Sequence, residues 1–252
     1  MREGLHKLLA QLRLSGMDEA LDGILDTAER EALPAAAVLL RLLQEEHRHR
    51  QERSIAYRLR QARLPWDWSL ESFPFDRQPA VAEHQIRALA GLEFLARAEN
   101  IVLIGPPGTG KTGLAIALLR QALLNGHRGR FYNAQELIDE LYASLADHST
   151  TRVLKRLAAY DLLVIDELGY LTLKPEHANA LFKLLEQRYG RKATVITTNL
   201  DYEQWYPLFR NKPLVDALLD RLQHRCITLR IDGLSLRTPE HPDPGPGGSA
   251  SN

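Results

Sequence analysis

The hydrophobic residues of the first 64 positions recur at helical spacing, without the alternation that is typical of strands. The first such set is Leu5, Leu8, Leu9 and Leu12. Residues three and four apart share one face of a helix, so each set predicts an amphipathic helix. Similar sets follow at 21–25 and 38–43, and Pro34 suits the first turn of a third helix. Residues 1–64 are therefore predicted to form a small all-α domain of three or four helices.

Residues 65–79 interrupt the helical pattern. Three prolines and several aromatic residues lie here, among them Trp66, Trp68, Phe73 and Phe75. Proline biases the residue before it towards extended backbone, so we expect an extended connector rather than another helix. The aromatic side chains are expected to pin this connector to the domain that follows.

From residue 80 to residue 237, short apolar stretches alternate with amphipathic ones. The predicted strands are 101–104, 130–132, 162–165, 193–198 and 226–231, and the predicted helices are 81–98, 111–125, 136–145, 176–189 and 214–222. Apolar strands that alternate with helices indicate a parallel sheet covered on both faces. We therefore predict an α/β domain with a five-stranded parallel sheet over 80–237. Residues 238–252 are rich in Pro, Gly and Ser and are predicted to be a disordered tail.

Composition narrows the possible classes of protein. The formal net charge is zero, from 32 Lys and Arg against 32 Asp and Glu, so any DNA contact must rest on a local patch. A single cysteine, Cys226, excludes an intrachain disulfide and a Cys-rich zinc site. No stretch has the length of a membrane span, and the N-terminus does not look like a signal peptide. We expect a cytoplasmic protein without a membrane partner.

One local patch of positive charge lies near the end of the predicted helical domain. Between residues 47 and 63, Glu52 is the only acidic residue. The basic residues of this run include Arg48, Arg50, Arg53, Arg58, Arg60 and Arg63. Such a run suits a nucleic-acid backbone, but it also suits a protein partner or a solvated helix face. The sequence leaves these alternatives open.

A glycine-rich loop follows the first predicted strand of the α/β domain and precedes a predicted helix. Its residues are Gly105, Pro106, Pro107, Gly108, Thr109, Gly110, Lys111 and Thr112, which match the Walker A pattern in full. Backbone amides of such a loop cradle phosphates at the helix N-terminus, and glycine permits their close approach. Lys111 is predicted to reach the β- and γ-phosphates of ATP, and Thr112 is predicted to bind Mg²⁺.

Two carboxylates follow the third predicted strand, in the Walker B pattern. Asp166 is predicted to hold Mg²⁺ through water, and Glu167 to polarise the attacking water. Asn199, at the end of the fourth strand, could orient the same water. Alternatively, Asn199 or Asp201 caps the helix that starts near Tyr202.

An arginine before the fifth predicted strand is a candidate for a contact between subunits. Arg221 could stabilise the charge on the phosphoryl group of ATP bound by a neighbouring subunit. The alternatives are an ion pair with Asp216 or Asp220 in the same chain, and a role for Arg225 in its place. The predicted catalytic residues are therefore Lys111, Glu167, Asn199 and Arg221.

Taken together, these motifs resemble those of the IstB-like ATP-binding proteins, and the chain is also similar to the DnaC-type helicase loaders. Both groups belong to the AAA+ class. The resemblance covers about 65–237 and includes Phe73 to Asp76, Gly105 to Thr112, Asp166 to Tyr170, Thr198 and Asn199, Asp220 to His224, and Gly233 to Arg237. Two positions depart from the family pattern: Gly113, where a bulkier residue is usual, and Leu236, where an aromatic residue is usual.

The resemblance implies an ATPase with ATP and Mg²⁺ as cofactors that assembles on duplex DNA as a ring or helical homo-oligomer. It would assist the transposase of the same insertion element in target selection or in assembly of the strand-transfer complex. Too few residues follow Arg237 for the helical lid of a full AAA+ domain, so a lid-less P-loop core is expected. Arg237 is either a substitute sensor residue or a surface arginine.

Three other functions remain open at this stage. A replicative helicase loader would favour single-stranded DNA and a helicase partner. A nucleotide-dependent scaffold would show little turnover. A small-molecule P-loop kinase would direct its base at a substrate hydroxyl, and it would need neither DNA nor a second subunit.

Overall fold

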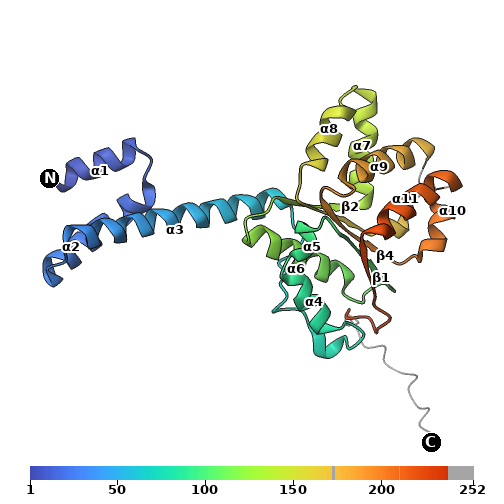
Figure 1. Cartoon of the computed structure of the whole chain (residues 1–252), viewed down its shortest axis with the longest axis horizontal. Coiled ribbons are helices and arrows are strands. Elements are labelled where there is room, and N and C mark those ends of the chain that lie inside the picture. The colour runs from blue at the N-terminus through green and yellow to red at the C-terminus, as the bar shows by residue number, and fades with distance from the viewer. Residues whose placement is uncertain (172–173, 210, 238–252) are drawn as a thin grey trace, which may run out of the picture. The chain divides into compact units, whose positions relative to one another are not determined.

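The computed structural model describes residues 1–171, 174–209 and 211–237 (Figure 1). The chain divides into two compact units, the first from Met1 to Gln61 and the second from Ala62 onwards. Each is described by itself below. The predicted tail, 238–252, lies outside the described residues.

The N-terminal unit consists of three helices, as its hydrophobic pattern predicts. These are α1 (Arg2–Gln11), α2 (Ser15–Glu31) and α3 (Ala35–Ala62). Met17, Leu21 and Leu42 form a small core. The buried carboxylate of Glu46 on α3 accepts hydrogen bonds from the backbone N–H groups of Gly16 and Met17, at 2.8 and 3.2 Å. These bonds join the start of α2 to α3.

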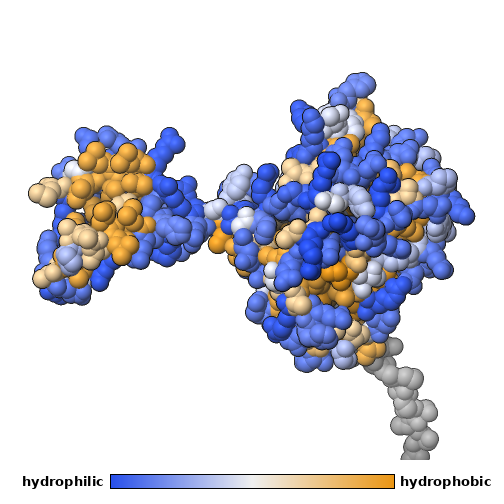
Figure 2. Space-filling model, in the orientation of Figure 1, coloured by the Kyte–Doolittle hydropathy of each residue, from blue (hydrophilic) through white to orange (hydrophobic). Residues whose placement is uncertain are grey.

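Exposed hydrophobic side chains gather on this unit (Figure 2). They include Leu5, Leu8 and Leu12 of α1 and Leu39, Leu40 and Leu43 of α3. No residue of α1 is buried. Exposed apolar patches of this kind are typical of surfaces that contact another molecule.

The arginine run of α3 carries less unpaired charge than its sequence indicates. Arg48 pairs with Glu45 and Glu52, and Arg50 pairs with Glu46 at 2.6 Å. Glu45 and Glu46 precede the run by less than one helical turn, so a helix brings them to the arginines. Whether the run contacts DNA or protein stays a prediction.

The second unit contains a sheet of five parallel strands in the order β2-β3-β4-β1-β5 (Figure 1). The strands are β1 (Asn100–Ile104), β2 (Gly129–Asn133), β3 (Leu162–Asp166), β4 (Ala193–Thr198) and β5 (Cys226–Arg230). Every residue of β1, β3 and β4 is buried. This explains their continuous apolar runs, and all five predicted strands are confirmed.

Helices cover both faces of the sheet (Figure 1). They are α4 (Glu83–Ala90), α5 (Glu93–Ala96), α6 (Lys111–Leu124), α7 (Ala134–Ala146), α8 (Thr150–Ala158), α9 (Pro175–Arg188), α10 (Trp205–Phe209) and α11 (Lys212–His224). Short 3₁₀ turns lie at 75–77, 168–170 and 202–204. Among these described residues, no helix is long and apolar enough to cross a membrane.

Two helix predictions need correction. The helix predicted over 81–98 is split into α4 and α5, because Leu92 adopts a left-handed conformation with a φ of 62°. An α-helix cannot continue through that conformation. In addition, α8 and α10 were not predicted, because nine- and five-residue helices span too few turns for a clear period.

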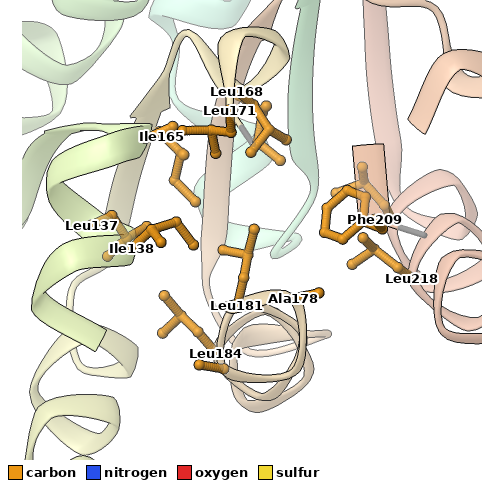
Figure 3. Close-up of a cluster of buried hydrophobic side chains, with 14 of the residues drawn as sticks. Leu137, Ile138, Ile165, Leu168, Leu171, Ala178, Leu181, Leu184, Phe209 and Leu218 are labelled. Atoms are coloured by element: carbon orange, nitrogen blue, oxygen red, sulfur yellow. The ribbon is translucent and has the colours of Figure 1, made fainter. Parts of the chain in front are cut away.

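One hydrophobic core supports the strand end that carries the predicted acidic residues. Figure 3 shows Ile165 of β3 beside Leu137 and Ile138 of α7, with Leu181 of α9 facing them. Phe209 and Leu218 extend the same core towards α11. Because this packing fixes the end of β3, it also fixes the backbone from which Asp166 and Glu167 project.

The aromatic connector packs against the start of α6, as the sequence predicts. The ring centroids of Trp68 and Phe73 lie 5.9 Å apart, and those of Phe73 and Phe75 lie 4.8 Å apart. A Cβ atom on Gly113 would lie 2.8 Å from the Trp68 ring. Gly113 therefore leaves room for the Trp68 ring.

Candidate active site

A pocket of about 710 Å³ opens at the carboxyl ends of the strands. Parallel strands bring these ends to one edge of the sheet, where binding sites of open α/β sheets lie. The glycine-rich loop and the ends of β3 and β4 contribute Lys111, Thr112, Glu167, Thr197, Thr198 and Asn199 to the lining. The connector and the chain after β5 contribute Trp66, Trp68, Pro74, Arg77, Leu236 and Arg237.

The glycine-rich loop leads directly into the N-terminus of α6. Gly108 and Gly110 have φ angles of 83° and 92°, which glycine adopts at little cost. The Lys111 ammonium donates to the carbonyl of Pro106 at 2.6 Å. Burial lowers the pKa of Lys111, although Asp166 and Glu167 oppose this shift. An anion in the pocket would find the positive end of a helix and a partly buried ammonium.

Asp166 lies under the loop and accepts hydrogen bonds from two threonines. Thr112 Oγ1 donates to Oδ1 at 2.9 Å, and Thr197 Oγ1 donates to the same oxygen at 2.5 Å. Burial is the largest influence on this carboxyl, and it raises the pKa of Asp166 even though both hydroxyls act in the opposite direction. The fold therefore holds, beneath the pocket, a carboxylate whose charged form it disfavours.

The raised pKa of Asp166 predicts the effect of removing its charge. A carboxyl whose folded-state pKa is raised stabilises the fold only when protonated, and at neutral pH its charge opposes folding. Asp166→Asn should therefore increase the free energy of unfolding of the nucleotide-free protein at pH 7, by roughly 1 kcal/mol. The gain should shrink as the pH falls through the raised pKa. Urea denaturation at pH 7 and at lower pH measures both effects.

Asp161 offers a matched control of opposite sign. Burial raises the pKa of Asp161, but Lys192 Nζ at 2.5 Å and the backbone N–H of Arg128 outweigh burial and lower it. The Asp161 carboxylate therefore stabilises the fold above its unfolded-state pKa, and Asp161→Asn should reduce stability at pH 7. A loss of stability in both variants would contradict the account of Asp166.

Glu167 adopts a strained backbone conformation at the pocket. Its φ is 61°, in the left-handed region that non-glycine residues rarely occupy. Its backbone N–H donates to Thr197 Oγ1 at 2.9 Å, and its Oε2 accepts from Asn133 Nδ2 at 3.1 Å. These two contacts hold both the backbone and the carboxylate of Glu167 at the end of the sheet.

Asn199 faces the pocket, and another residue caps the following turn. Asp201 and Gln204 form a capping box at the 3₁₀ turn over 202–204. Asn199 Oδ1 is buried and has no hydrogen-bond partner among the described residues. A Cβ atom on Gly169 would overlap with this oxygen, so Gly169 allows Asn199 its position. Asn199 is among the lining residues of the pocket, but this oxygen lies against Gly169 rather than at the pocket surface.

Arg221 lies away from the other predicted catalytic residues. It lines a small surface depression together with Asn100 and Thr194, which lie at the starts of β1 and β4. The glycine-rich loop follows the opposite end of β1, a five-residue strand about 15 Å long. Arg221 forms an ion pair with Glu186 at 3.4 Å and covers the Phe182 ring. Neither sequence alternative, Asp216 or Asp220, is its partner.

The sequence analysis assigned no role to Thr197, Asn133 or Arg77, which the structure places at or beside the pocket. Thr197 joins Asp166 to Glu167 from a different strand, and Asn133 reaches Glu167 from the end of β2. Their only sequence signal is a polar residue at the end of a predicted strand. Arg77 comes from the connector and Arg237 from the chain after β5, and no motif pointed to Arg77.

The sheet order, the loop after β1 and the acidic pair after β3 together define a P-loop domain of the AAA+ class. The chain belongs to the family of IstB-like ATP binding proteins, whose family model matches residues 7–242. The match also covers the N-terminal helices, beyond the stretch in which the motifs showed a resemblance.

Similar chains are described as ATP-binding proteins of insertion sequences. The chain is 39% identical over 236 residues to that of IS21 from Pseudomonas aeruginosa, covering 94% of this chain and 89% of the relative. It is 33% identical over 240 residues to that of IS5376 from Geobacillus stearothermophilus, covering 95% and 96%.

Solved structures agree with the fold. A crystal structure of the DnaC helicase loader superposes with a TM-score of 0.53 at 26% identity, covering 68% of this chain and all of that chain. The DnaI structure gives a TM-score of 0.56 at 20% identity, covering 68% and 90%, and this likeness concerns the fold alone.

Proposed function

We propose that this protein hydrolyses ATP with Mg²⁺, assembles as a homo-oligomer on duplex DNA, and assists the transposase of its own insertion sequence. The assistance would concern target selection or assembly of the strand-transfer complex. The observation that carries the ATPase proposal is the convergence of Lys111, Thr112, Glu167 and Asn199 on one pocket, with Asp166 beneath it. The insertion-sequence names of the relatives support the role in transposition.

The hydroxyl of Thr112 and the carboxylate of Asp166 fit a magnesium site. Thr112 donates its proton to Asp166, so a lone pair of its oxygen is free to bind a cation. Asp166, which accepts the hydrogen bond from Thr112, would lie behind the threonine and would not bind the ion directly. We propose that it accepts a hydrogen bond from a water that the ion holds. Mg²⁺ neutralises charge on the phosphates when it is bound. All-oxygen ligands with retained waters are the set that this ion prefers.

The other pocket residues suit hydrolysis by water. Lys111 is proposed to exchange the Pro106 carbonyl for a phosphate oxygen, which is a better partner because the bond is charged on both sides. Glu167 is proposed to accept a proton from the attacking water, and Asn199, which lines the pocket, to orient that water. A kinase would need a second substrate beside Glu167 in place of the water.

A second subunit is part of the proposal, because Arg221 cannot reach the nucleotide of its own chain. Its side chain is about one-third exposed, so a neighbour can bring its own phosphates to it. The exposed leucines of the N-terminal unit offer a further contact surface. We propose that residues 1–64 bind DNA or a partner, that 65–79 connect, and that 80–237 bind and hydrolyse ATP. A cytoplasmic location is part of the proposal, since ATP and DNA meet there.

The second candidate is a helicase loader, which the likeness to the DnaC structure favours. The two proposed functions differ in the DNA that they require, which is duplex for the transposition role and single-stranded for the helicase loader. Phosphate release by the full chain should require Mg²⁺, should rise with duplex DNA more than with single strands, and should fall about 100-fold or more in Lys111→Ala. Stimulation by single strands alone would favour the loader. No phosphate release under any condition would contradict the ATPase proposal and favour a scaffold.

A further inference from the structure

A second depression lies in the surface of the ATPase unit, between α8 and the end of α9. The two helices lie side by side (Figure 1). The depression has a volume of about 530 Å³. Its lining includes Thr151, Lys155 and Ala158 of α8, and Gln187, Arg191 and Lys192 at the end of α9. Among the described residues that line it, three are cations and none is a carboxylate. We call it the basic depression.

The basic depression lies at the end of the sheet opposite the nucleotide pocket. The helix α8 ends at Ala158, just before β3 starts at Leu162, and α9 ends at Arg188, just before β4 starts at Ala193. The depression is therefore near the amino ends of these two strands. The nucleotide pocket opens at their carboxyl ends, so a ligand in the basic depression does not compete with ATP.

Two of the three cations in the basic depression lack a carboxylate partner. Lys192 Nζ pairs with Asp161 at 2.5 Å. Lys155 and Arg191 are exposed, and within the described part of the chain neither of them forms an ion pair. The neighbouring Arg156 differs from them, because it pairs with Glu140. The uncompensated positive charge of the depression therefore comes from Lys155 and Arg191.

A buried arginine holds the two sides of the basic depression together. The Arg188 side chain has almost no exposed surface. Its Nη1 donates to the carbonyls of Leu157 and Tyr160, each at 2.9 Å, and its Nε donates to Thr194 Oγ1 at 3.0 Å. These bonds tie the end of α8 to the start of β4. They also occupy carbonyls at a helix C-terminus, whose partial negative charge would otherwise repel an anion.

We propose that the basic depression binds the phosphodiester backbone of duplex DNA through Lys155 and Arg191. The inference rests on the proposed function and names a surface of the ATPase unit that contacts the DNA. Interfaces with DNA are far more positive than interfaces with protein, in which lysine is depleted and aromatic residues are enriched. Lysine and arginine beside small or polar side chains match the first kind of interface. Contacts to phosphates alone carry no sequence preference.

The basic depression also lies next to the surface that is proposed to meet a neighbouring subunit. Glu186 and Tyr189 of α9 line the depression around Arg221, and Gln187, from the same turn of α9, lines the basic depression. A duplex bound here would run close to the junction between two subunits. Consecutive subunits would then place their basic depressions along one duplex, which couples DNA binding to assembly.

The test measures the salt dependence of duplex binding. A fluorescein-labelled duplex is titrated with the full-length chain, Mg²⁺ and the slowly hydrolysed analogue ATPγS, and fluorescence anisotropy gives Kd at several salt concentrations. For Lys155→Gln combined with Arg191→Gln, we expect about 10-fold weaker binding. The slope of log Kd against log salt should fall by about two, one for each lost phosphate contact. Duplexes of unrelated sequence should lose affinity equally. Lys183→Gln, an exposed change on α9 outside the depression, is the matched control.

A second variant changes the charge of the basic depression without removing a cation. Gln187→Glu places a carboxylate beside Arg191 and should also weaken duplex binding, whereas Gln85→Glu, an exposed change on α4, should not. The changed side chains are exposed, so the thermal unfolding midpoint of each variant should stay within about 2 °C of wild type. This measurement separates a lost DNA contact from a damaged fold.

The outcomes separate this inference from the proposed function. If wild type binds duplex and the Lys155 and Arg191 double variant keeps its affinity and salt slope, the inference is overturned and the proposed function survives. If wild type binds only single strands, the proposed role on duplex fails, and a loss of single-strand binding in the same variants would still place the DNA backbone in the depression. If wild type binds no DNA, both fail.

Discussion

An equal mixture of Arg221→Ala and Lys111→Ala proteins should hydrolyse ATP at about a quarter of the wild-type rate, although neither protein is active alone. Arg221 lies at the opposite end of β1 from the phosphate loop. Under the proposed function, a complete site therefore takes Lys111 from one chain and Arg221 from the next. In a random mixture, about one interface in four combines an intact pocket with an intact arginine. Steady-state phosphate release by the mixed proteins measures this.

The control for this experiment is a mixture of Lys111→Ala and Glu167→Gln. Both residues lie at one pocket, so no interface in this mixture is complete and no activity should return. Arg221→Ala should fold normally, since its ion pair with Glu186 is partly exposed and exposed pairs contribute about 1 kcal/mol or less. Full activity of Arg221→Ala alone would remove Arg221 from the site, and equal recovery in both mixtures would contradict the shared site.

Glu167→Gln should bind ATP normally, hydrolyse it about 100- to 10,000-fold more slowly, and keep the protein in its ATP-bound assembly. The glutamine oxygen can still accept from Asn133, and the backbone bond to Thr197 is unchanged, so the pocket keeps its shape. Under the proposed mechanism, only the ability to take a proton from the attacking water is lost. Single-turnover hydrolysis and nucleotide retention on a spin column measure the two effects. Glu176→Gln, an exposed change at the start of α9, is the control and should behave as wild type.

The sequence predicts the sheet well because its strands are buried on both faces. A strand such as β3, which is buried along its whole length, leaves a short continuous apolar run from Leu162 to Ile165 that ends at a polar residue. The break between α4 and α5 depends on one left-handed residue, Leu92, whose side chain has no special preference for that conformation. Short helices such as α8 depend on tertiary packing, which the local pattern does not contain.

The residues of the candidate site likewise fall into those that the sequence predicts and those that only the fold brings together. Lys111, Asp166 and Glu167 belong to short motifs in which the chemistry and the local backbone share a few consecutive residues, so the sequence predicts them. Arg237 comes from the chain after β5, which the pairing of β5 with β1 brings beside the loop that follows β1. The sequence predicted both strands but not their adjacency, so it left the position of Arg237 open.

We propose that ATP drives assembly of this chain on duplex DNA. The most direct test is the particle mass of the Glu167→Gln protein with ATP and Mg²⁺, measured with and without duplex DNA. We expect large assemblies that form, or grow more stable, when duplex is added, and that disappear when ADP replaces ATP. A monomer or dimer that duplex does not change would contradict the claim, and single-stranded DNA with a helicase partner would then be the next ligands to test.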